Sequence, residues 1–214
     1  MKTGKMEIST CVLGPVRTNC YILINQDSKE CIIVDPGSGA EIIEARIEKD
    51  NLKPVAILLT HGHFDHILAV KDIASAYQVP VYANEEEQEV LLDDRYNLSL
   101  DFNGASFSVD ANNYLYDGEK FMLAGFNIEA IATPGHTKGG MCYYFSEEKV
   151  LVTGDTLFRG TVGRTDLPTS NMGQIIHSVC EKLKPVIDDA IVLPGHGESS
   201  TMGYERKTNP YLEA

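Results

Sequence analysis

A histidine-rich hexapeptide at the end of an apolar run constrains the fold of this chain more than any other feature. Residues 55–60 follow Pro54 and have the length and composition of a buried strand. The hexapeptide His61-Gly62-His63-Phe64-Asp65-His66 comes directly after this run, and the apolar residues 67–70 open a predicted helix. Because loops at the carboxyl ends of strands carry the sites of layered α/β proteins, the hexapeptide is predicted to form part of a site.

The order of side chains in the hexapeptide indicates two neighbouring metal positions. His61 and His63 are two residues apart, so an extended backbone points both rings to one side. Asp65 and His66 follow where the chain turns into the helix, and we expect them to aim at a neighbouring point. Burying these groups at a strand end without a cation to share would cost a large desolvation free energy. This cost favours metal ligands over ordinary surface or core histidines.

Charge and cysteine content exclude several classes of function. The 214 residues carry a net charge of −13, which argues against a nucleic-acid partner and against attraction to anionic membranes. The first residues have no apolar core, so no signal peptide is expected, and no apolar run approaches the length of a membrane span. Five cysteines without C-x-x-C spacing predict reduced thiols in a cytoplasmic protein.

The pattern of the whole chain predicts an α/β protein with two sheets. Strands are predicted over residues 7–13, 20–25, 31–34, 55–60, 81–83, 114–116, 121–123, 126–133, 141–145, 150–152 and 190–193. Helices are predicted over residues 40–50, 67–78, 85–92 and 171–184, with the acidic residues of 85–92 facing solvent. Each half of the chain places strands first, then a histidine-bearing loop, then a helix. This order favours two sheets face to face with helices outside, as one domain over residues 1–214.

Three further strand ends carry potential ligands, namely His136, Asp155 and His196. Asp35 also ends a strand, and it is either an acceptor that orients a ligand loop or a turn residue. His177 lies within a predicted helix and is expected to have no catalytic part. Residues 93–113 follow no period; they either wall a substrate pocket or pack over the core.

Together these motifs resemble the metallo-β-lactamase-fold superfamily over nearly the full length of the chain. The motifs that carry the resemblance are Thr60-His61-Gly62-His63-Phe64-Asp65-His66, Thr133-Pro134-Gly135-His136, Thr153-Gly154-Asp155-Thr156-Leu157-Phe158 and Gly195-His196. Within the superfamily the chain is similar to the short bacterial members of the glyoxalase II (hydroxyacylglutathione hydrolase) group. The resemblance implies a four-layer αββα sandwich without the helical C-terminal domain of the longer glyoxalases.

The resemblance also implies a set of metal ligands. His61, His63 and His136 would hold one ion, Asp65, His66 and His196 would hold a second, and Asp155 would bridge them. Two divalent ions per chain are therefore expected. Histidine and carboxylate ligands suit zinc, and also iron or manganese.

The function implied by the resemblance is a dinuclear metal-dependent hydrolase that cleaves a small-molecule acyl thioester. Asp65 and Asp155, with a metal-bridging hydroxide, would form its catalytic centre, and Arg164 would bind a substrate carboxylate. A thiol of pKa about 8.5 leaves as thiolate without a strong general acid. Longer glyoxalases bind glutathione through a lysine and two tyrosines, where this chain has Arg164, Asp166 and Glu198, so the thiol carrier stays open.

Other activities of the superfamily are the alternatives. Gly163-Arg164-Thr165-Asp166 is similar to a segment of persulfide dioxygenases, in which the equivalents of His61, His136 and Asp155 hold a single iron. Arg159 and Arg164 near the site would also suit a phosphodiesterase. A non-catalytic, metal-stabilised module is the remaining alternative. The presence of Asp155, which true metallo-β-lactamases lack, disfavours a β-lactamase.

Overall fold

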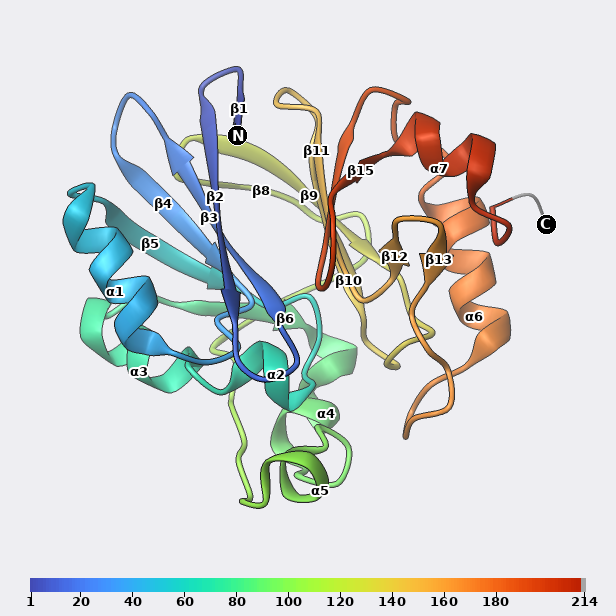
Figure 1. The fold of residues 1–214 in the computed structure, drawn as a ribbon, viewed down its shortest axis with the longest axis horizontal. Helices are drawn as coiled ribbons and strands as arrows, with labels where there is room; N and C mark the ends of the chain where they lie inside the picture. The colour runs from blue at the N-terminus through green and yellow to red at the C-terminus, as the bar shows by residue number, and fades with distance from the viewer. Residues whose placement is uncertain (213–214) are drawn as a thin grey trace.

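The computed structural model describes residues 1–212, which fold into two β-sheets packed face to face (Figure 1). The strand order is β1-β2-β3-β4-β5-β6-β7 in the first sheet and β15-β14-β11-β10-β9-β8 in the second. Helices α1 and α3 cover the outer face of the first sheet, and α6 and α7 cover that of the second (Figure 1). The result is a sandwich of four layers.

The first sheet begins antiparallel and continues parallel. Its strands are β1 (Lys2–Thr3), β2 (Met6–Leu13), β3 (Thr18–Asn25), β4 (Glu30–Val34), β5 (Lys53–Leu58), β6 (Val81–Asn84) and β7 (Asn113–Leu115). Strands β4 and β5 are parallel neighbours, so their carboxyl ends lie at the same edge. Asp35 and the hexapeptide therefore leave the sheet side by side.

The second sheet brings three more strand ends to one edge. Its strands are β8 (Lys120–Leu123), β9 (Phe126–Ala132), β10 (Met141–Phe145), β11 (Val150–Gly154), β14 (Ile191–Pro194) and β15 (Ser200–Thr201). Both β9 and β11 are antiparallel to β10, and β14 is parallel to β11. The carboxyl ends of β9, β11 and β14, which precede His136, Asp155 and His196, consequently point the same way. A separate hairpin, β12 (Leu157–Phe158) and β13 (Thr161–Val162), follows Asp155.

Helices and apolar clusters complete the layers. The helical segments are α1 (Ala40–Lys49), α2 (Phe64–Ile67), α3 (Val70–Tyr77), η1 (Glu85–Glu87), α4 (Gln88–Leu92), α5 (Ser99–Asn103), α6 (Met172–His177), η2 (Ser178–Lys182) and α7 (Met202–Thr208). Leu23, Phe126 and Tyr143 belong to the apolar cluster between the two sheets. Ile43 and Ile175 belong to the clusters beneath the outer helices of the first and second sheets. Each helical layer thus buries one apolar stripe.

The helix predicted over residues 67–78 starts earlier and is interrupted. It begins at Phe64, inside the hexapeptide, and α2 and α3 are separate helices. The backbone N–H of Ala69 donates to the carbonyl of Pro36 at 3.0 Å instead of continuing α2. A contact with a distant turn therefore divides the helix.

The structure also revises the C-terminal part of the prediction. The helix expected over residues 171–184 is α-helical only as far as His177, and the segment that follows, η2, is π-helical. The short elements β1, β12, β13, β15, α5 and α7 were absent from the sequence-based prediction. Residues 93–113 contain α5 and combine both alternatives, because Phe107 packs against the core whereas Leu98 and Phe102 line a pocket.

The predicted αββα architecture is confirmed. The single domain predicted over residues 1–214 includes residues 213–214, which lie outside the described part of the chain. Among the helices of residues 1–212, none has the length and apolarity needed to cross a membrane.

Candidate metal centre

The strand ends of both sheets converge on two groups of histidines and carboxylates. Within each group the potential ligand atoms lie within 4.8 Å of one another. The first group is His61, His63 and His136, and the second is Asp65, His66 and His196. A third set, Asp35, His61 and His66, overlaps with both and comes from the first sheet alone. In the first and second groups, two residues come from the hexapeptide of the first sheet and one from a loop of the second. The structure therefore brings together the residues that the sequence predicted as ligands of each ion.

The first group consists of three imidazole rings that converge. Nδ1 of His63 lies 2.9 Å from Nε2 of His136. The other ring nitrogen of His136 pairs with the carbonyl of Arg164 at 2.9 Å, which fixes the ring with Nε2 toward the group. Burial lowers the pKa of His61 and of His63 well below the usual value, so both rings offer lone pairs.

The second group is charged. Nε2 of His196 lies 3.2 Å from Oδ2 of Asp65, and Nε2 of His66 lies 3.5 Å from the same oxygen. Burial opposes protonation of His66, but Asp65, Asp155 and Asp35 outweigh it and raise its pKa to about 10. A cation bound at this group would replace the proton on His66.

Asp155 lies between the two groups. Its Oδ1 is 3.5 Å from Nε2 of His66, and its Oδ2 is 3.5 Å from Nε2 of both His136 and His196. The β14 loop approaches so closely that a Cβ at Gly195 would lie 2.1 Å from Oδ1 of Asp155. A side chain at position 195 would therefore displace the carboxylate.

The donor set fits divalent cations. Nε2 of His61, Nε2 of His66 and Oδ1 of Asp155 are buried without a hydrogen-bond partner among the described residues. Buried polar atoms of this kind are costly unless a ligand or ion satisfies them. Imidazole nitrogens with carboxylate oxygens are the donors that zinc, iron and manganese accept.

Asp35 orients both the hexapeptide and His66. Its carboxylate accepts hydrogen bonds from the backbone N–H and the hydroxyl of Thr60, at 2.8 and 2.6 Å, and contacts Nδ1 of His66 at 2.9 Å. Of the two alternatives for Asp35, these contacts are those of an acceptor that orients a ligand loop.

The first two residues of β3 hold parts of the second group in place, a role that the sequence analysis missed. The hydroxyl of Thr18 donates to Oδ2 of Asp65 at 2.7 Å. The amide of Asn19 donates to the carbonyls of Pro194 and Gly197, both at 3.0 Å, and so fixes the loop that carries His196. Nothing in the local sequence distinguishes these polar residues from others at the start of a strand.

Glu87 corrects the prediction that the acidic residues of 85–92 face solvent. It is 1% exposed, and its two oxygens accept the backbone N–H groups of Gly62 and Gly139, each at 2.8 Å. One carboxylate thus joins the loops that carry both parts of the first group. Burial raises the pKa of Glu87 to about 7, against the effect of these donors. The spacing to the apolar Val90 and Leu91 was a usable signal, because residues three and four apart share a helix face.

A pocket of about 470 Å³ opens above both groups. Arg164 lines it, but Nε and Nη2 of its guanidinium donate to the two carboxylate oxygens of Asp166, both at 2.7 Å. The predicted substrate-binding arginine is therefore at the pocket and already paired.

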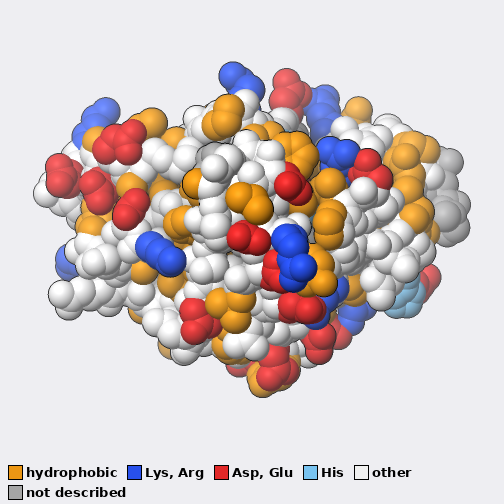
Figure 2. Space-filling view, turned by 90° about the horizontal axis from the view of Figure 1, so that it is seen from below, with side chains coloured by type: hydrophobic (Ala, Val, Ile, Leu, Met, Phe, Trp, Pro, Cys, Tyr) orange, Lys and Arg blue, Asp and Glu red, His pale blue; other side chains and the backbone are white. Residues whose placement is uncertain are grey.

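On the face where α4 and α5 lie toward the viewer, basic and acidic side chains adjoin each other among apolar ones (Figure 2).

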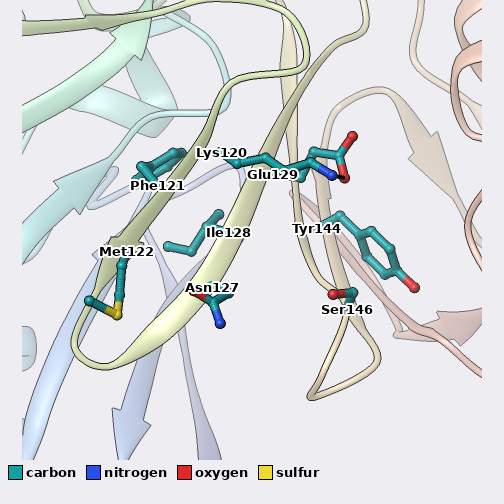
Figure 3. A pocket seen from close by; sticks show the side chains of 8 residues that line it. All are labelled: Lys120, Phe121, Met122, Asn127, Ile128, Glu129, Tyr144 and Ser146. Carbon is teal, nitrogen blue, oxygen red and sulfur yellow. Dashed lines mark ion pairs between the residues drawn. The ribbon is translucent and has the colours of Figure 1, made fainter.

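A second hollow, of about 350 Å³, lies over β8, β9 and β10 (Figure 3). Lys120 and Glu129 form an ion pair of 3.5 Å across it, and Tyr144 and Ser146 lie at its other side (Figure 3). None of its lining residues belongs to a group that could hold a metal ion. The chemistry-bearing residues thus gather in the first pocket.

Two mixed sheets whose strand ends present a group of three histidines beside a group of two histidines and a carboxylate are typical of a class of metallo-hydrolase. The chain belongs to the metallo-beta-lactamase superfamily, whose sequence model matches residues 13–196. This membership supports a metal-dependent hydrolase of a superfamily that binds divalent metals.

Three relatives are similar over almost their full length. Hydroxyacylglutathione hydrolase GloC of Haemophilus influenzae is 36% identical over 212 residues, which cover 98% of this chain and 99% of the relative. The crystal structure of BLEG-1 B3 metallo-beta-lactamase has 37% identity and a TM-score of 0.92, covering 97% of this chain and 100% of that one. The crystal structure of TTHA1623 in a di-iron-bound form has 32% identity and a TM-score of 0.83, covering 95% and 100%.

Proposed function

We propose that this protein is a dinuclear metal-dependent thioesterase of glyoxalase II type, which hydrolyses S-acylglutathione or a related acyl thioester. The observation that carries the proposal is the position of Asp155, whose two oxygens face histidines of both groups. The hydroxyacylglutathione hydrolase and the di-iron protein among its relatives support the reaction and the number of metal ions.

The proposed ligands follow the two groups. His61, His63 and His136 would hold one divalent ion, Asp65, His66 and His196 the other, and Asp155 both. Zinc is the proposed metal, with iron or manganese as alternatives. When bound, such a pair lowers the pKa of a shared water toward neutrality and polarises the carbonyl under attack.

The residues of the chain supply orientation. Burial opposes ionisation of Asp65, but His66, His196 and the hydroxyl of Thr18 outweigh it and lower its pKa, so Asp65 stays a carboxylate. Asp65 and Asp155 both line the pocket and would orient the attacking water by accepting its protons. Asp35, Thr18 and Glu87 would hold the ligand loops in place.

The lining of the pocket favours a thioester over an amide. Among the described residues that line it there is no lysine or tyrosine, and Arg164 is paired with Asp166. A thiol leaves as thiolate without a proton donor, whereas an amide or β-lactam nitrogen must be protonated. The relative described as a B3 metallo-beta-lactamase nevertheless makes β-lactam hydrolysis the second candidate.

The proposed compartment is the cytoplasm. All five cysteines are free, which is the state that a reducing compartment maintains.

The test combines elemental analysis with substrate turnover. Protein purified without chelator is expected to contain about two metal ions per chain and to hydrolyse S-acyl thioesters faster than nitrocefin or bis(p-nitrophenyl) phosphate. A single iron per chain with oxygen uptake on glutathione persulfide would replace the proposal by persulfide oxidation. Faster hydrolysis of nitrocefin would favour the β-lactamase, and bound metal without any turnover would favour a structural module.

A further inference from the structure

One wall of the pocket above the metal centre is aromatic and open. Phe64, Leu98 and Phe102 line it, and the rings of Phe64 and Phe102 stack with centroids 6.0 Å apart and planes 4° apart. Phe102 is 65% exposed. A large apolar side chain that faces a pocket and keeps most of its surface in water is typical of a binding site for an apolar group.

This wall is built into the fold. The N–H of Phe64 donates to the carbonyl of Asn97 at 2.7 Å, so α2 and the segment before α5 are joined. The buried side chain of Asn97 donates to the carbonyl of Phe107 and accepts the N–H of Ser99. Leu98 between them has a φ of 64°, which costs free energy for a branched side chain and is held by these contacts.

The remaining lining is also largely apolar. Val16, at the tip of the β2–β3 hairpin, and Phe158, Val162 and Leu167 also line the pocket, with the polar Thr161 beside them. The non-reacting parts of a bound substrate would therefore contact mostly carbon.

The charges around the pocket are already matched. Arg164 is the one lysine or arginine among the described lining residues, and Nε and Nη2 of its guanidinium donate to the two carboxylate oxygens of Asp166. Arg159, next to the lining residue Phe158, pairs with Glu198. A carboxylate on a substrate would have to compete with these acidic partners for the arginines, in a chain of net charge −13.

We propose that the pocket selects thioesters with an apolar acyl group and an uncharged thiol, in preference to those of a thiol that carries carboxylates, such as glutathione. This inference rests on the proposed thioesterase function and restricts the class of thioesters that the enzyme would accept. The acyl chain would lie against Phe64, Leu98 and Phe102, and the paired arginines would give no anchor to an anionic thiol.

The experiment compares acetyl, butyryl and hexanoyl thioesters of glutathione and of N-acetylcysteamine on the metal-loaded protein. We expect kcat/KM to rise about two- to fourfold per methylene, and to be about tenfold higher for the neutral thiol. Equal rates for the three acyl groups, or higher kcat/KM for glutathione, would overturn the inference.

Matched variants locate the effect. Phe102→Ala should reduce the dependence of kcat/KM on the length of the acyl chain. Leu100 is a 48% exposed residue of the same helix outside the pocket, so Leu100→Ala should retain this dependence. Asp166→Asn should release Arg164 and reduce the disadvantage of glutathione about tenfold. Asp189→Asn removes the same charge from an exposed ion pair with Lys149, and it should leave the ratio of kcat/KM between the two thiols unchanged.

A binding measurement separates this inference from the proposed function. The non-hydrolysable thioethers S-hexyl-N-acetylcysteamine and S-hexylglutathione are titrated by calorimetry. If no thioester is turned over, tighter binding of the neutral thioether would still support the apolar site while the thioesterase proposal fails. Tighter binding of S-hexylglutathione would reject the apolar, uncharged specificity even in an active thioesterase.

Discussion

Asp155 is the residue that both halves of the proposed centre share. Replacing it with alanine removes the carboxylate that faces His66, His136 and His196 and leaves those nitrogens without a common partner. Asp155→Ala should therefore lose metal and lower thioesterase kcat by more than about 100-fold.

Metal content and turnover of the same preparation check this prediction. The control is His177→Ala, because His177 is exposed at the end of α6 and should be replaceable without effect. Full turnover by Asp155→Ala would contradict a dinuclear mechanism, and a large loss in His177→Ala would contradict our interpretation of that histidine.

Glu87 predicts a pH dependence of stability. Burial raises its pKa in the folded protein to about 7, above the value of about 4.3 in an unfolded chain. Between pH values of about 4.3 and 7 the folded state binds more protons than the unfolded state. Protonated Glu87 therefore contributes to the free energy of unfolding; this contribution is complete below pH of about 4 and is lost as the pH rises through about 7. Across this pH range the shift in pKa changes the free energy of unfolding by an amount on the order of 3 kcal/mol.

Urea unfolding of the wild type and of Glu87→Gln across this range measures the effect. The difference between the two free energies of unfolding should change by a few kcal/mol from pH 5 to pH 8. Glu86→Gln, at the exposed neighbour, should stay parallel to the wild type. Parallel curves for Glu87→Gln would show that Glu87 does not titrate in this range.

At the scale of single residues, local chemistry determined which residue roles could be predicted from the sequence. Histidines and aspartates recur at several strand ends, and the family resemblance sorts them into two sets, so the residues that gather in the two groups were predictable. Thr18 and Glu87 act through contacts with Asp65 and Gly62, which lie far along the chain. No spacing rule within one segment connects such pairs.

At the scale of elements, the loop after His136 rests directly on η1. A Cβ at Gly139 would lie 2.3 Å from the backbone nitrogen of Glu87, so an added methyl group must push the two segments apart. Gly139→Ala should therefore lower the free energy of unfolding by about 1–3 kcal/mol and weaken metal binding.

The matched control is Gly173→Ala in α6, where the nearest atom to a new Cβ is the side-chain oxygen of Asn171 at 3.3 Å. Because alanine is a better helix former than glycine, this variant should be neutral or more stable by about 0.5 kcal/mol. Unfolding midpoints and metal content of both variants check the prediction. Equal stability of the two variants would contradict the close contact.

Long elements were easier to predict than short ones. The strands of residues 18–25 and 141–145 and the helix of residues 40–49 follow clear apolar patterns, and the structure places each within two residues of its predicted bounds. Two-residue strands such as β12 and β13 are too short to have a period. The break between α2 and α3 depends on Pro36, so it could not be read from the helix itself.

At the scale of the whole molecule, metal removal should destabilise the fold. A ligand at about 100 times its dissociation constant adds about 2.7 kcal/mol, which for a chain of this size raises Tm by at least about 5 °C. Scanning calorimetry with and without chelator should record this loss and its recovery on adding zinc, manganese or iron. Asp155→Ala should show a smaller shift, and an unchanged Tm in the wild type would contradict metal binding at buried ligands.

The two sheets meet through polar contacts as well as through the apolar cluster between them. The hydroxyl of Tyr21 donates to the carbonyl of Pro194, and that of Tyr143 donates to the carbonyl of Leu59, both at 2.7 Å. The first reaches the last residue of β14 in the second sheet, and the second reaches the residue that follows β5 in the first sheet. The architecture was predictable from the order of motifs, but these crossings were not, because a buried tyrosine looks like any other aromatic core residue in a sequence.

The division of each ligand group between the two sheets has a consequence for the life of the protein in a cell. Two donors of every proposed ion come from the first sheet, and one histidine and the shared Asp155 come from the second, so each ion would link the two sheets. Parting of the halves and escape of the metal then become a single event. The supply of metal would consequently govern how quickly proteases degrade the chain, independently of how quickly it works.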